Sequence, residues 1–435
     1  MANFESGKVL KTATGADVVI DRYIGGGGQG DVYMVDYGGK KRALKWYKPE
    51  SIRNPDAFYR NLENNVSNGS PSPAFLWPLA VMERAEGSFG YVMELRPSGY
   101  EEFTKILANE NCHFASFTVA VEACLQIISA FRILHNHGYS YQDLNDGNFF
   151  INPQNGNVLI CDNDNVAPNG DTTGILGKPR YMAPEIVAGR GKVLPNTQSD
   201  RYSLATILFM ILTFGHPLEG RHWLVPCLTD AIAEQLYGVQ PLFIFDSEND
   251  ANRPNPQVQK DVVAVWNCFP DYVKEAFIKA FSQDALKNPA RRLKEFDWLN
   301  VFARFRNDIR RCSCGSDMFL LNSSTTKCDV CSSPVEVKHC MQLPTYNVAV
   351  TIGTKIYRCQ LGYCNPDDAL ELLFVVVANP GNPNAVGIKN LTNMVLLATT
   401  PSGHLKQVPP GGIVPFMEGI TLSVYEKKVV LKNVQ

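Results

Sequence analysis

The chain of 435 residues is long enough for two or three domains. Apolar residues make up 45% of it and charged residues 19%, which is ordinary for a globular protein and excludes a disordered one. The net charge of −2 provides no basic field for nucleic acid or an anionic membrane. Residues 1–19 lack the pattern of a signal peptide, and the longest apolar run, 204–214, is too short to span a bilayer. We therefore expect a cytoplasmic protein without nucleic acid or membrane partners.

Short apolar stretches separated by glycine-rich turns dominate the first part of the chain. This pattern predicts β-strands at 16–24, 31–37, 41–47, 75–82 and 90–95. One interruption, 54–66, begins near Pro55 and has apolar residues at helical spacing, so it predicts a helix.

From about residue 100 to 310 the pattern becomes helical. The segment 117–138 has apolar residues at helical spacing and ends at Gly138, a residue type favoured just after a helix. The segment 201–215 is apolar nearly all round and predicts a buried helix, whereas 270–283 is amphipathic. The polar stretch 246–257 is predicted to be a surface loop. A β-rich lobe therefore precedes a helical lobe.

A glycine-rich turn, IGGGGQGDVY at 24–33, joins the first two predicted strands. Glycines let backbone amides approach phosphate oxygens, although four consecutive glycines are also typical of a flexible turn. Lys45 follows inside a strand, where it could hold phosphates, and Glu63 in the predicted helix could pair with it. The alternatives are a solvent-facing lysine and a surface glutamate.

The segment YSYQDLNDGNFFIN, residues 139–152, places Asp143 five residues before Asn148, and an apolar run follows. This spacing suits chemistry on a phosphate group, in which the acid handles the proton of a hydroxyl and the amide holds a metal ion. The alternative is a polar turn before a strand. Other ordered motifs are YVMEL (91–95), CDND (161–164), GKPRYMAPE (177–185), SDRYSLATILFMILTFGHP (199–217) and NPARRL (288–293). Together these motifs resemble the protein kinase family, whose catalytic loop usually reads H-R-D-L-K-x-x-N.

The resemblance implies a bilobal α+β kinase fold that transfers the γ-phosphoryl group of ATP to a protein hydroxyl. Asp143 would accept or orient that hydroxyl, and Lys45 would bind phosphates with Glu63 behind it. Asn148 and Asp162 would hold Mg2+ or Mn2+, while Asp164 would share that role or be a solvated turn residue. The residues implied to bind ATP are Gly25, Gly27, Gly30, Val32, Ala43, Lys45, Met93, Glu94 and Leu95.

Three more residues have supporting roles by resemblance. Glu185 and Arg292 would form a structural ion pair, and Asp200 would anchor the backbone of the catalytic loop.

The catalytic loop departs from the family pattern at three positions. Asn145 replaces the lysine that meets the transferred phosphate, so a positive charge is missing. Gln142 replaces the arginine that usually serves a phosphorylated activation segment, so we expect no phosphorylation requirement at Thr172 or Thr173. Tyr141 replaces the histidine, which we interpret as a packing change.

Four cysteines, Cys312, Cys314, Cys328 and Cys331, form two close pairs. Four thiolates in two such pairs suit tetrahedral zinc, and the pattern resembles a zinc ribbon or knuckle, although the first pair is one residue shorter than C-x-x-C. The residues between the pairs are predicted to form a hairpin. The alternatives are reduced thiols or, in the absence of a secretory signal, the less favoured disulfides.

After residue 341 short strands alternate with turns, which predicts a β-sandwich. The latter half resembles a forkhead-associated domain, without a convincing Arg and Ser/His pair for phosphothreonine. Over the whole chain there is a resemblance to bacterial kinases of the TerY phosphorylation triad. It implies as candidate partners a metal-dependent protein phosphatase and a von Willebrand A-domain protein.

The predicted domains are a kinase domain at 1–308, with lobes at 17–96 and 97–308, a zinc ribbon-like module at 309–340, and a sandwich at 341–435. Since Lys45, Asp143, Asn148 and Asp162 are all present, an active serine/threonine protein kinase using ATP, Mg2+ and Zn2+ is favoured. A nucleotide-binding pseudokinase scaffold is the first alternative. A small-molecule kinase is the second, and the RYMAPE segment argues against it because that segment builds a peptide-docking platform.

Overall fold

The computed structural model describes residues 4–108, 111–172, 174, 177–320, 325–328, 330–379 and 382–434. The chain divides into two compact units that each draw on separate stretches. The first unit comprises Met1–Phe114, Ile133–Asn255 and Ala280–Arg292, and the second comprises Ala115–Arg132, Pro256–Lys279 and Leu293–Gln435. The predicted domain boundaries at 308 and 340 stay a prediction.

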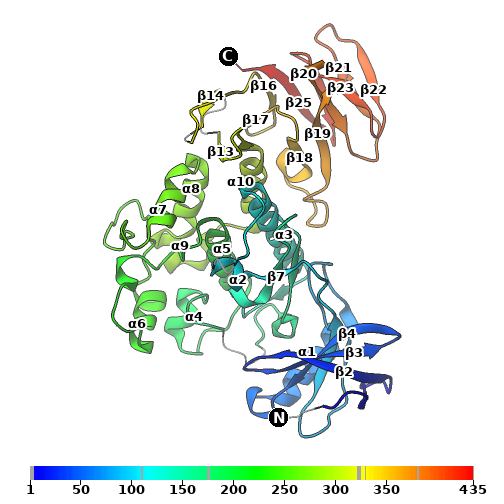
Figure 1. Ribbon diagram of the computed structural model, residues 1–435, viewed down its shortest axis with the longest axis vertical. Helices are drawn as coiled ribbons and strands as arrows, with labels where there is room; N and C mark the ends of the chain where they lie inside the picture. The colour runs from blue at the N-terminus through cyan, green and yellow to red at the C-terminus, as the bar shows by residue number, and fades with distance from the viewer. Residues whose placement is uncertain are drawn as a thin grey trace. The chain divides into compact units, whose positions relative to one another are not determined.

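An antiparallel sheet with the order β1-β2-β3-β4-β6-β5 opens the first unit. Its strands are β1 (Val9–Lys11), β2 (Asp17–Gly26), β3 (Gly30–Tyr37), β4 (Lys40–Tyr47), β5 (Ala80–Val81) and β6 (Gly90–Glu94). The predicted helix is α1 (Pro55–Asn68), which lies beside this sheet (Figure 1). The Asn54 side chain caps its start by accepting from Ala57 N, and Pro55 fits the first turn because it needs no amide partner there. Phe58 and Leu62 bury the inner face of the helix.

The rest of the first unit combines short strands with helices. The strands are β7 (Glu101–Glu102), β8 (Tyr139–Ser140), β9 (Phe149–Ile151), β10 (Val158–Ile160) and β11 (Ala167–Pro168). The helices are α2 (Phe103–Leu107), α4 (Pro184–Gly189), α5 (Thr197–Thr213), α6 (Asp230–Glu234) and α9 (Gln283–Lys287). Helix α5 is buried along nearly its whole length, as its all-round apolar sequence predicts. The segment 246–257 is a loop, as expected, although Asp246 and Asn252 within it are buried and not on the surface.

The second unit contains most of α3 (Phe117–Asn136) and α8 (Asp271–Ala280), with α7 (Lys260–Cys268) and α10 (Glu295–Asp308). Phe277, Trp298 and Phe302 form an aromatic core between α8 and α10, with 5.0 Å between the ring centroids of Phe277 and Trp298. Helix α3 is long and apolar enough by composition to cross a membrane. However, 61% of its most apolar stretch is buried inside the protein, as in a core helix.

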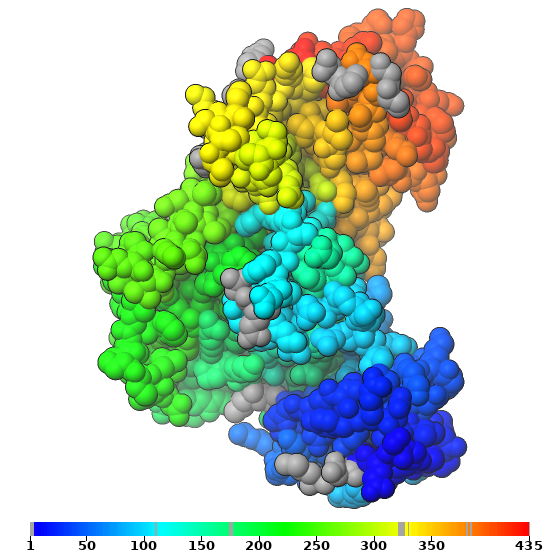
Figure 2. All heavy atoms as spheres, viewed as in Figure 1, coloured from blue at the N-terminus to red at the C-terminus, as the bar shows by residue number. Residues whose placement is uncertain are grey.

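Two small hairpins carry the clustered cysteines, and a β-sandwich follows them in the second unit. The hairpins pair β12 (Ile309–Arg311) with β13 (Asp317–Phe319) and β14 (Thr325–Lys327) with β15 (Pro334–Glu336). The prediction of one hairpin between the cysteine pairs is therefore wrong for the described residues, because β13 and β14 each pair with a strand outside that segment so that each cysteine pair lies in a turn of its own. Residues 321–324 lie outside the described residues. Leu320 packs against Val337, Ala349 and Val434, so the cysteine-bearing segment (yellow) touches the strands that follow (Figure 2).

The sandwich itself has a six-stranded and a four-stranded antiparallel sheet, in the orders β17-β16-β25-β24-β21-β22 and β18-β19-β20-β23. Buried residues from both sheets, among them Met341, Phe374 and Leu431, form one core. This confirms the predicted all-β region. The strands are β16 (His339–Gln342), β17 (Asn347–Ala349), β18 (Lys355–Tyr357), β19 (Leu372–Asn379), β20 (Asn382–Asn390), β21 (Leu396–Thr399), β22 (Leu405–Val408), β23 (Ile413–Pro415), β24 (Thr421–Val424) and β25 (Lys427–Asn433).

Candidate active site

The β9–β10 hairpin brings together two residues that are far apart in sequence. Phe149 pairs with Ile160, so Asn148 before the first strand and Asp162 after the second lie at the same end of the hairpin. The amide of Cys161 donates to the carbonyl of Asn148 at 2.9 Å and closes this end. The spacing of the two predicted metal ligands therefore follows from the register of one hairpin.

The carboxylate of Asp200, near the start of α5, holds the backbone of the catalytic loop. This carboxylate accepts from the backbone amides of Tyr141, at 2.6 Å, and Gln142, at 3.2 Å. The ring of His135 also lies within hydrogen-bond distance of it, at 3.1 Å. Asp200 thus anchors the loop backbone as predicted.

Asp143 lies in this loop with a carboxyl group that is mostly withdrawn from water. Burial raises the pKa of Asp143 to about 7, against a lowering by the hydrogen bond from Asn145 and a further raising by Asp162. The Asn145 amide donates to the Asp143 carboxylate at 3.1 Å, and the Asn148 amide donates to the Asp143 carbonyl at 2.7 Å. A carboxyl group with this pKa is suited to accept a proton near neutral pH.

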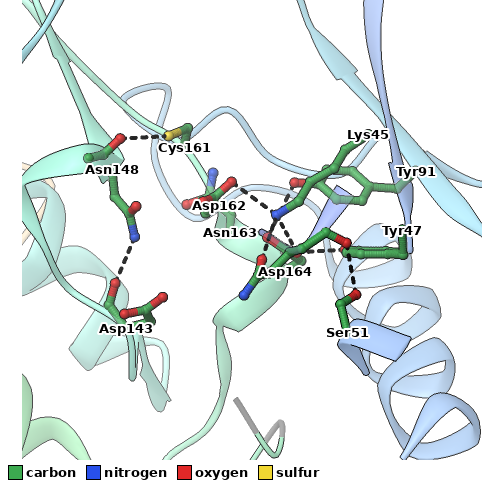
Figure 3. Close-up of polar contacts among 12 residues, drawn as sticks. Lys45, Tyr47, Ser51, Tyr91, Asp143, Asn148, Cys161, Asp162, Asn163 and Asp164 are labelled. Carbon is green, nitrogen blue, oxygen red and sulfur yellow. Dashed lines mark hydrogen bonds and ion pairs between the residues drawn. The ribbon is translucent and has the colours of Figure 1, made fainter. Parts of the chain in front are cut away.

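Lys45 on β4 lies at the centre of a buried polar network (Figure 3). Its ammonium is 2.9 Å from Asp164 Oδ2 and 3.1 Å from Asp162 Oδ1, and only 5% of the residue is exposed. Tyr47 and Tyr91 donate their hydroxyls to the same Asp164 carboxylate, at 2.6 and 3.3 Å. Burial alone would lower the pKa of Lys45, but the two carboxylates raise it, so the ammonium stays charged.

Glu63 does not make the predicted pair with Lys45. The face of α1 that looks toward the site carries Asn61 and Asn65, whose amides both donate to the carbonyl of Val166, at 2.8 and 3.0 Å. Glu63 is exposed on another face of the helix. The carboxylate partner of Lys45 therefore comes from Asp164 and not from α1.

Asp164 is neither a solvated turn residue nor placed as a metal ligand. It is fully buried, and both of its carboxylate oxygens accept from Lys45 and the two tyrosines. Asp162 differs because its backbone is left-handed, with φ of 53°, and 36% of its side chain is exposed. The following turn at Asn163–Asn165 then directs Asp164 inward.

The side chains of Asn148 and Asp162 fit a divalent cation. The Asn148 amide nitrogen donates to the Asp143 carbonyl, so the amide oxygen is the atom of Asn148 that could act as a metal ligand, and 36% of the Asp162 side chain is exposed. Carboxylate and amide oxygens are the atoms that Mg2+ prefers in proteins.

Most of the residues predicted to bind ATP lie on β2, β3, β4 and β6, while Gly27 is in the turn after β2 and Leu95 directly follows β6. Val32 pairs with Lys45 and Ala43 pairs with Met93 across the sheet. Ala43 and Met93 belong to an apolar cluster that also contains Val32, Leu95 and Leu159, which suits an adenine ring. Leu159 of β10 was not predicted to belong to the ATP site, because the sequence of this short strand shows that one side is buried but not which side chains face the site. Glu94 is exposed and bonds Arg42.

The glycine-rich turn joins β2 and β3, and the amide of Gly27 donates to the carbonyl of Gly30 at 2.8 Å. A side chain at Gly30 would lie 2.4 Å from the Trp46 carbonyl, so this position requires glycine, whereas Gly25 and Gly27 have open space around them. Gln29 in this turn accepts from the Lys45 ammonium at 3.0 Å. Nothing in the sequence pointed to Gln29 or to the two network tyrosines.

Two contacts hold the activation segment, one near its start and one near its end. Arg292 and Glu185 form the predicted ion pair as two parallel hydrogen bonds of 2.8 and 2.6 Å. Gln142 donates to the carbonyl of Asp171 at 2.8 Å, so an amide holds the start of this segment where kinases often use an arginine. Thr172 is exposed, and Thr173 lies outside the described residues.

The four clustered cysteines come together in the second unit. Their sulfur atoms all lie within 4.8 Å of one another, with 3.4 Å between Cys312 and Cys331 and 3.7 Å between Cys314 and Cys328. Tetrahedral zinc with Zn–S bonds of about 2.3 Å requires sulfur separations of about 3.8 Å. The cluster therefore fits zinc.

Comparison with known proteins identifies the family. The sequence model described as "Protein kinase domain" matches residues 18–265, more than half of the chain. The chain belongs to the protein kinase family.

Several kinases resemble this one. Protein kinase YegI of Escherichia coli O157:H7 is 23% identical over 350 residues, which cover 74% of this chain and 50% of the relative. Serine/threonine-protein kinase PknJ of Mycobacterium tuberculosis is 30% identical over 214 residues, covering 46% of this chain and 34% of PknJ. The crystal structure of the Mycobacterium tuberculosis PknI kinase domain is 16% identical, with a TM-score of 0.44 over 69% of this chain and 98% of that chain. The chain spans about half the length of the YegI kinases it matches.

The environment of Asp143 generates a prediction about its proton affinity. In the magnesium-free kinase, carbon NMR titration should give Asp143 a pKa of about 7. Asn145→Ala should raise this pKa, because the carboxylate loses a hydrogen bond that favours its charged form. Gln154→Ala, in the exposed turn between β9 and β10, is the control and should leave it unchanged. A pKa that stays the same or falls in Asn145→Ala would contradict the assigned hydrogen bond.

The buried network predicts that stability and ATP use depend on Asp164 but not on Glu63. Asp164→Asn should destabilise the first unit by about 3–5 kcal/mol, because it removes one partner of a buried ion pair. It should also weaken ATP use, since Lys45 loses the carboxylate that positions it. Glu63→Gln is the matched control and should change neither the unfolding midpoint nor the KM for ATP. An equal loss in both variants would show that Glu63 shares the role assigned to Asp164.

Proposed function

We propose that this protein is a serine/threonine protein kinase that transfers the γ-phosphoryl group of ATP with the aid of magnesium. The observation that carries the proposal is the convergence of Asp143, Asn148, Asp162 and Lys45 at one end of the β9–β10 hairpin. The name of PknJ supports serine/threonine specificity.

The residues of the site divide the work of an in-line transfer. Asp143 would accept the proton of the substrate hydroxyl as its oxygen attacks phosphorus, and its pKa of about 7 suits that exchange. Lys45 would bind ATP phosphates after giving up its bond to Gln29. Asn148 and Asp162 would hold Mg2+, which neutralises charge between the phosphates. Most of the rate enhancement would come from positioning and charge neutralisation.

The second unit supplies a docking function in this proposal. The Cys312, Cys314, Cys328 and Cys331 cluster would hold zinc as a structural centre, and the sandwich would be a degenerate forkhead-associated domain. Arg358 in its first half is bonded by Asp368, at 2.9 Å, and Glu371, at 3.1 Å. Because two internal carboxylates already balance this guanidinium, protein docking is favoured over phosphothreonine recognition. By resemblance to the TerY triad, the partners would be a metal-dependent phosphatase and a von Willebrand A-domain protein.

Phosphate transfer is the direct test of kinase activity. Wild type should transfer label from ATP to itself or to a generic basic protein, and Asp143→Asn should lower the rate at least about 10²-fold because the base is lost. Binding of ATP should survive this change. ATP binding without transfer by wild type, on any substrate including the proposed partners, would instead support the pseudokinase scaffold.

The cysteine cluster predicts one zinc ion per chain. Cys328→Ser should lose most of this zinc during dialysis against a weak chelator, because a hydroxyl is a poor replacement for a thiolate. Cys268→Ser, an exposed cysteine outside the cluster, should keep the full content. Metal analysis by mass spectrometry checks both. Unchanged zinc in Cys328→Ser would contradict the four-cysteine site.

A further inference from the structure

Asn145 stands where the catalytic loop lacks a lysine, and its side chain is fully engaged. Its amide nitrogen donates to the carbonyl and carboxylate of Asp143, each at 3.1 Å. Its amide oxygen accepts from the backbone of Gly147 at 3.0 Å and so caps the turn before β9. Only 3% of the residue is exposed. Asn145 therefore organises the loop and adds no charge to it.

The same amide oxygen accepts a second hydrogen bond, from the ammonium of Lys178 at 3.0 Å. Lys178 belongs to the GKPRYMAPE segment, 33 residues further along the chain. Its ammonium is also 3.8 Å from the Asp146 carboxylate. Asn145 thus links the carboxylate of the proposed base on one side to a lysine ammonium on the other.

The backbone beside Lys178 is held against the catalytic loop. A Cβ at Gly177 would lie 3.1 Å from Asp143 Oδ1 and 3.5 Å from the Gln142 carbonyl, so the chain passes directly over the proposed base. The carbonyl of Lys178 accepts from the amides of Tyr181 and Met182, at 2.9 and 3.2 Å. The start of the lysine side chain is therefore fixed beside Asp143.

The end of the Lys178 side chain remains accessible. Its side chain is 60% exposed, whereas that of Lys45 is 6% exposed and bonded to Asp162 and Asp164. A lysine on a flexible four-carbon stem can contact an incoming anion while its backbone stays in place. Lys178 lowers the pKa of Asp143, so its charge already acts on the reacting region.

We propose that Lys178 supplies, from the activation segment, the positive charge that meets the transferred phosphoryl group. This inference rests on the proposed kinase activity. In the transfer, the substrate oxygen forms a bond to the γ-phosphorus and the bond from that phosphorus to the β–γ bridging oxygen breaks. The electron pair leaves with ADP, and the hydroxyl proton goes to Asp143. Lys178 keeps its proton and contacts the non-bridging oxygens, where charge is carried in the transition state.

The experiment compares wild type with Lys178→Met and with Asn145→Lys/Lys178→Asn, which exchanges the two residues across their hydrogen bond. Turnover with ATP is the first measurement. Calorimetric affinity for Mg-ADP, alone and with aluminium fluoride as a mimic of the transferred group, is the second. Lys192→Met, an exposed lysine after α4, is the matched control.

Lys178→Met should lower kcat about 10²-fold and weaken binding of the aluminium fluoride complex to a similar extent, with unchanged affinity for Mg-ADP. The exchanged variant should recover most of both losses, and Lys192→Met should match wild type. If Lys178→Met stays within threefold of an active wild type, or weakens both nucleotide complexes equally, the role of Lys178 is overturned while the kinase proposal stands. If wild type itself shows no transfer, the kinase proposal fails and the role of Lys178 fails with it.

Discussion

The site depends on keeping the charged Lys45 ammonium in the interior of the first unit. Burial of an unpaired ammonium is strongly unfavourable, so the fold must supply carboxylates with matching hydrogen-bond geometry. Asp164 and Asp162 do so, and Tyr47 and Tyr91 donate two further hydrogen bonds to Asp164. As a result, strand β4 and the turn after β10 are held in a fixed relation, and the proposed phosphate-binding and metal-binding groups are positioned together.

The carboxylate that pairs with Lys45 comes from a turn and not from a helix, which bears on how the activity could be regulated. In protein kinases a lysine on a strand and a glutamate on a helix must pair, and movement of the helix regulates activity. Here Asp164 follows the same hairpin as the proposed metal ligand Asp162, while α1 is joined to this region through Asn61, Asn65 and the Val166 carbonyl. Displacing α1 would break those amide contacts and also disturb the Phe58 ring that packs on Tyr47, with 5.3 Å between ring centroids. The helix therefore reaches the ion pair of Lys45 through Tyr47, which donates to Asp164, and not through a carboxylate of its own.

The sequence was informative where spacing alone determines geometry. A hairpin between Asn148 and Asp162, two close cysteine pairs and an all-round apolar helix beginning near Asp200 each have one simple folded outcome. The sequence did not show which side chains point toward the site. Glu63 is two residues beyond Asn61, about 200° around the helix, and no pattern in α1 shows which polar residue faces the site. Likewise, only the left-handed backbone of Asp162 separates an exposed carboxylate there from a buried one at Asp164.

Each residue of the catalytic loop that departs from the family pattern makes a contact of its own with a neighbouring part of the site. The Tyr141 hydroxyl donates to the Cys161 carbonyl, so it connects the loop to the residue before Asp162. Gln142 holds the Asp171 carbonyl, and Asn145 connects Asp143 to Lys178. The proposed base is therefore still connected by hydrogen bonds, through Asn145, to a lysine of the activation segment. The substituted residues each hold a neighbour of the site in place, and this favours an active enzyme over a scaffold.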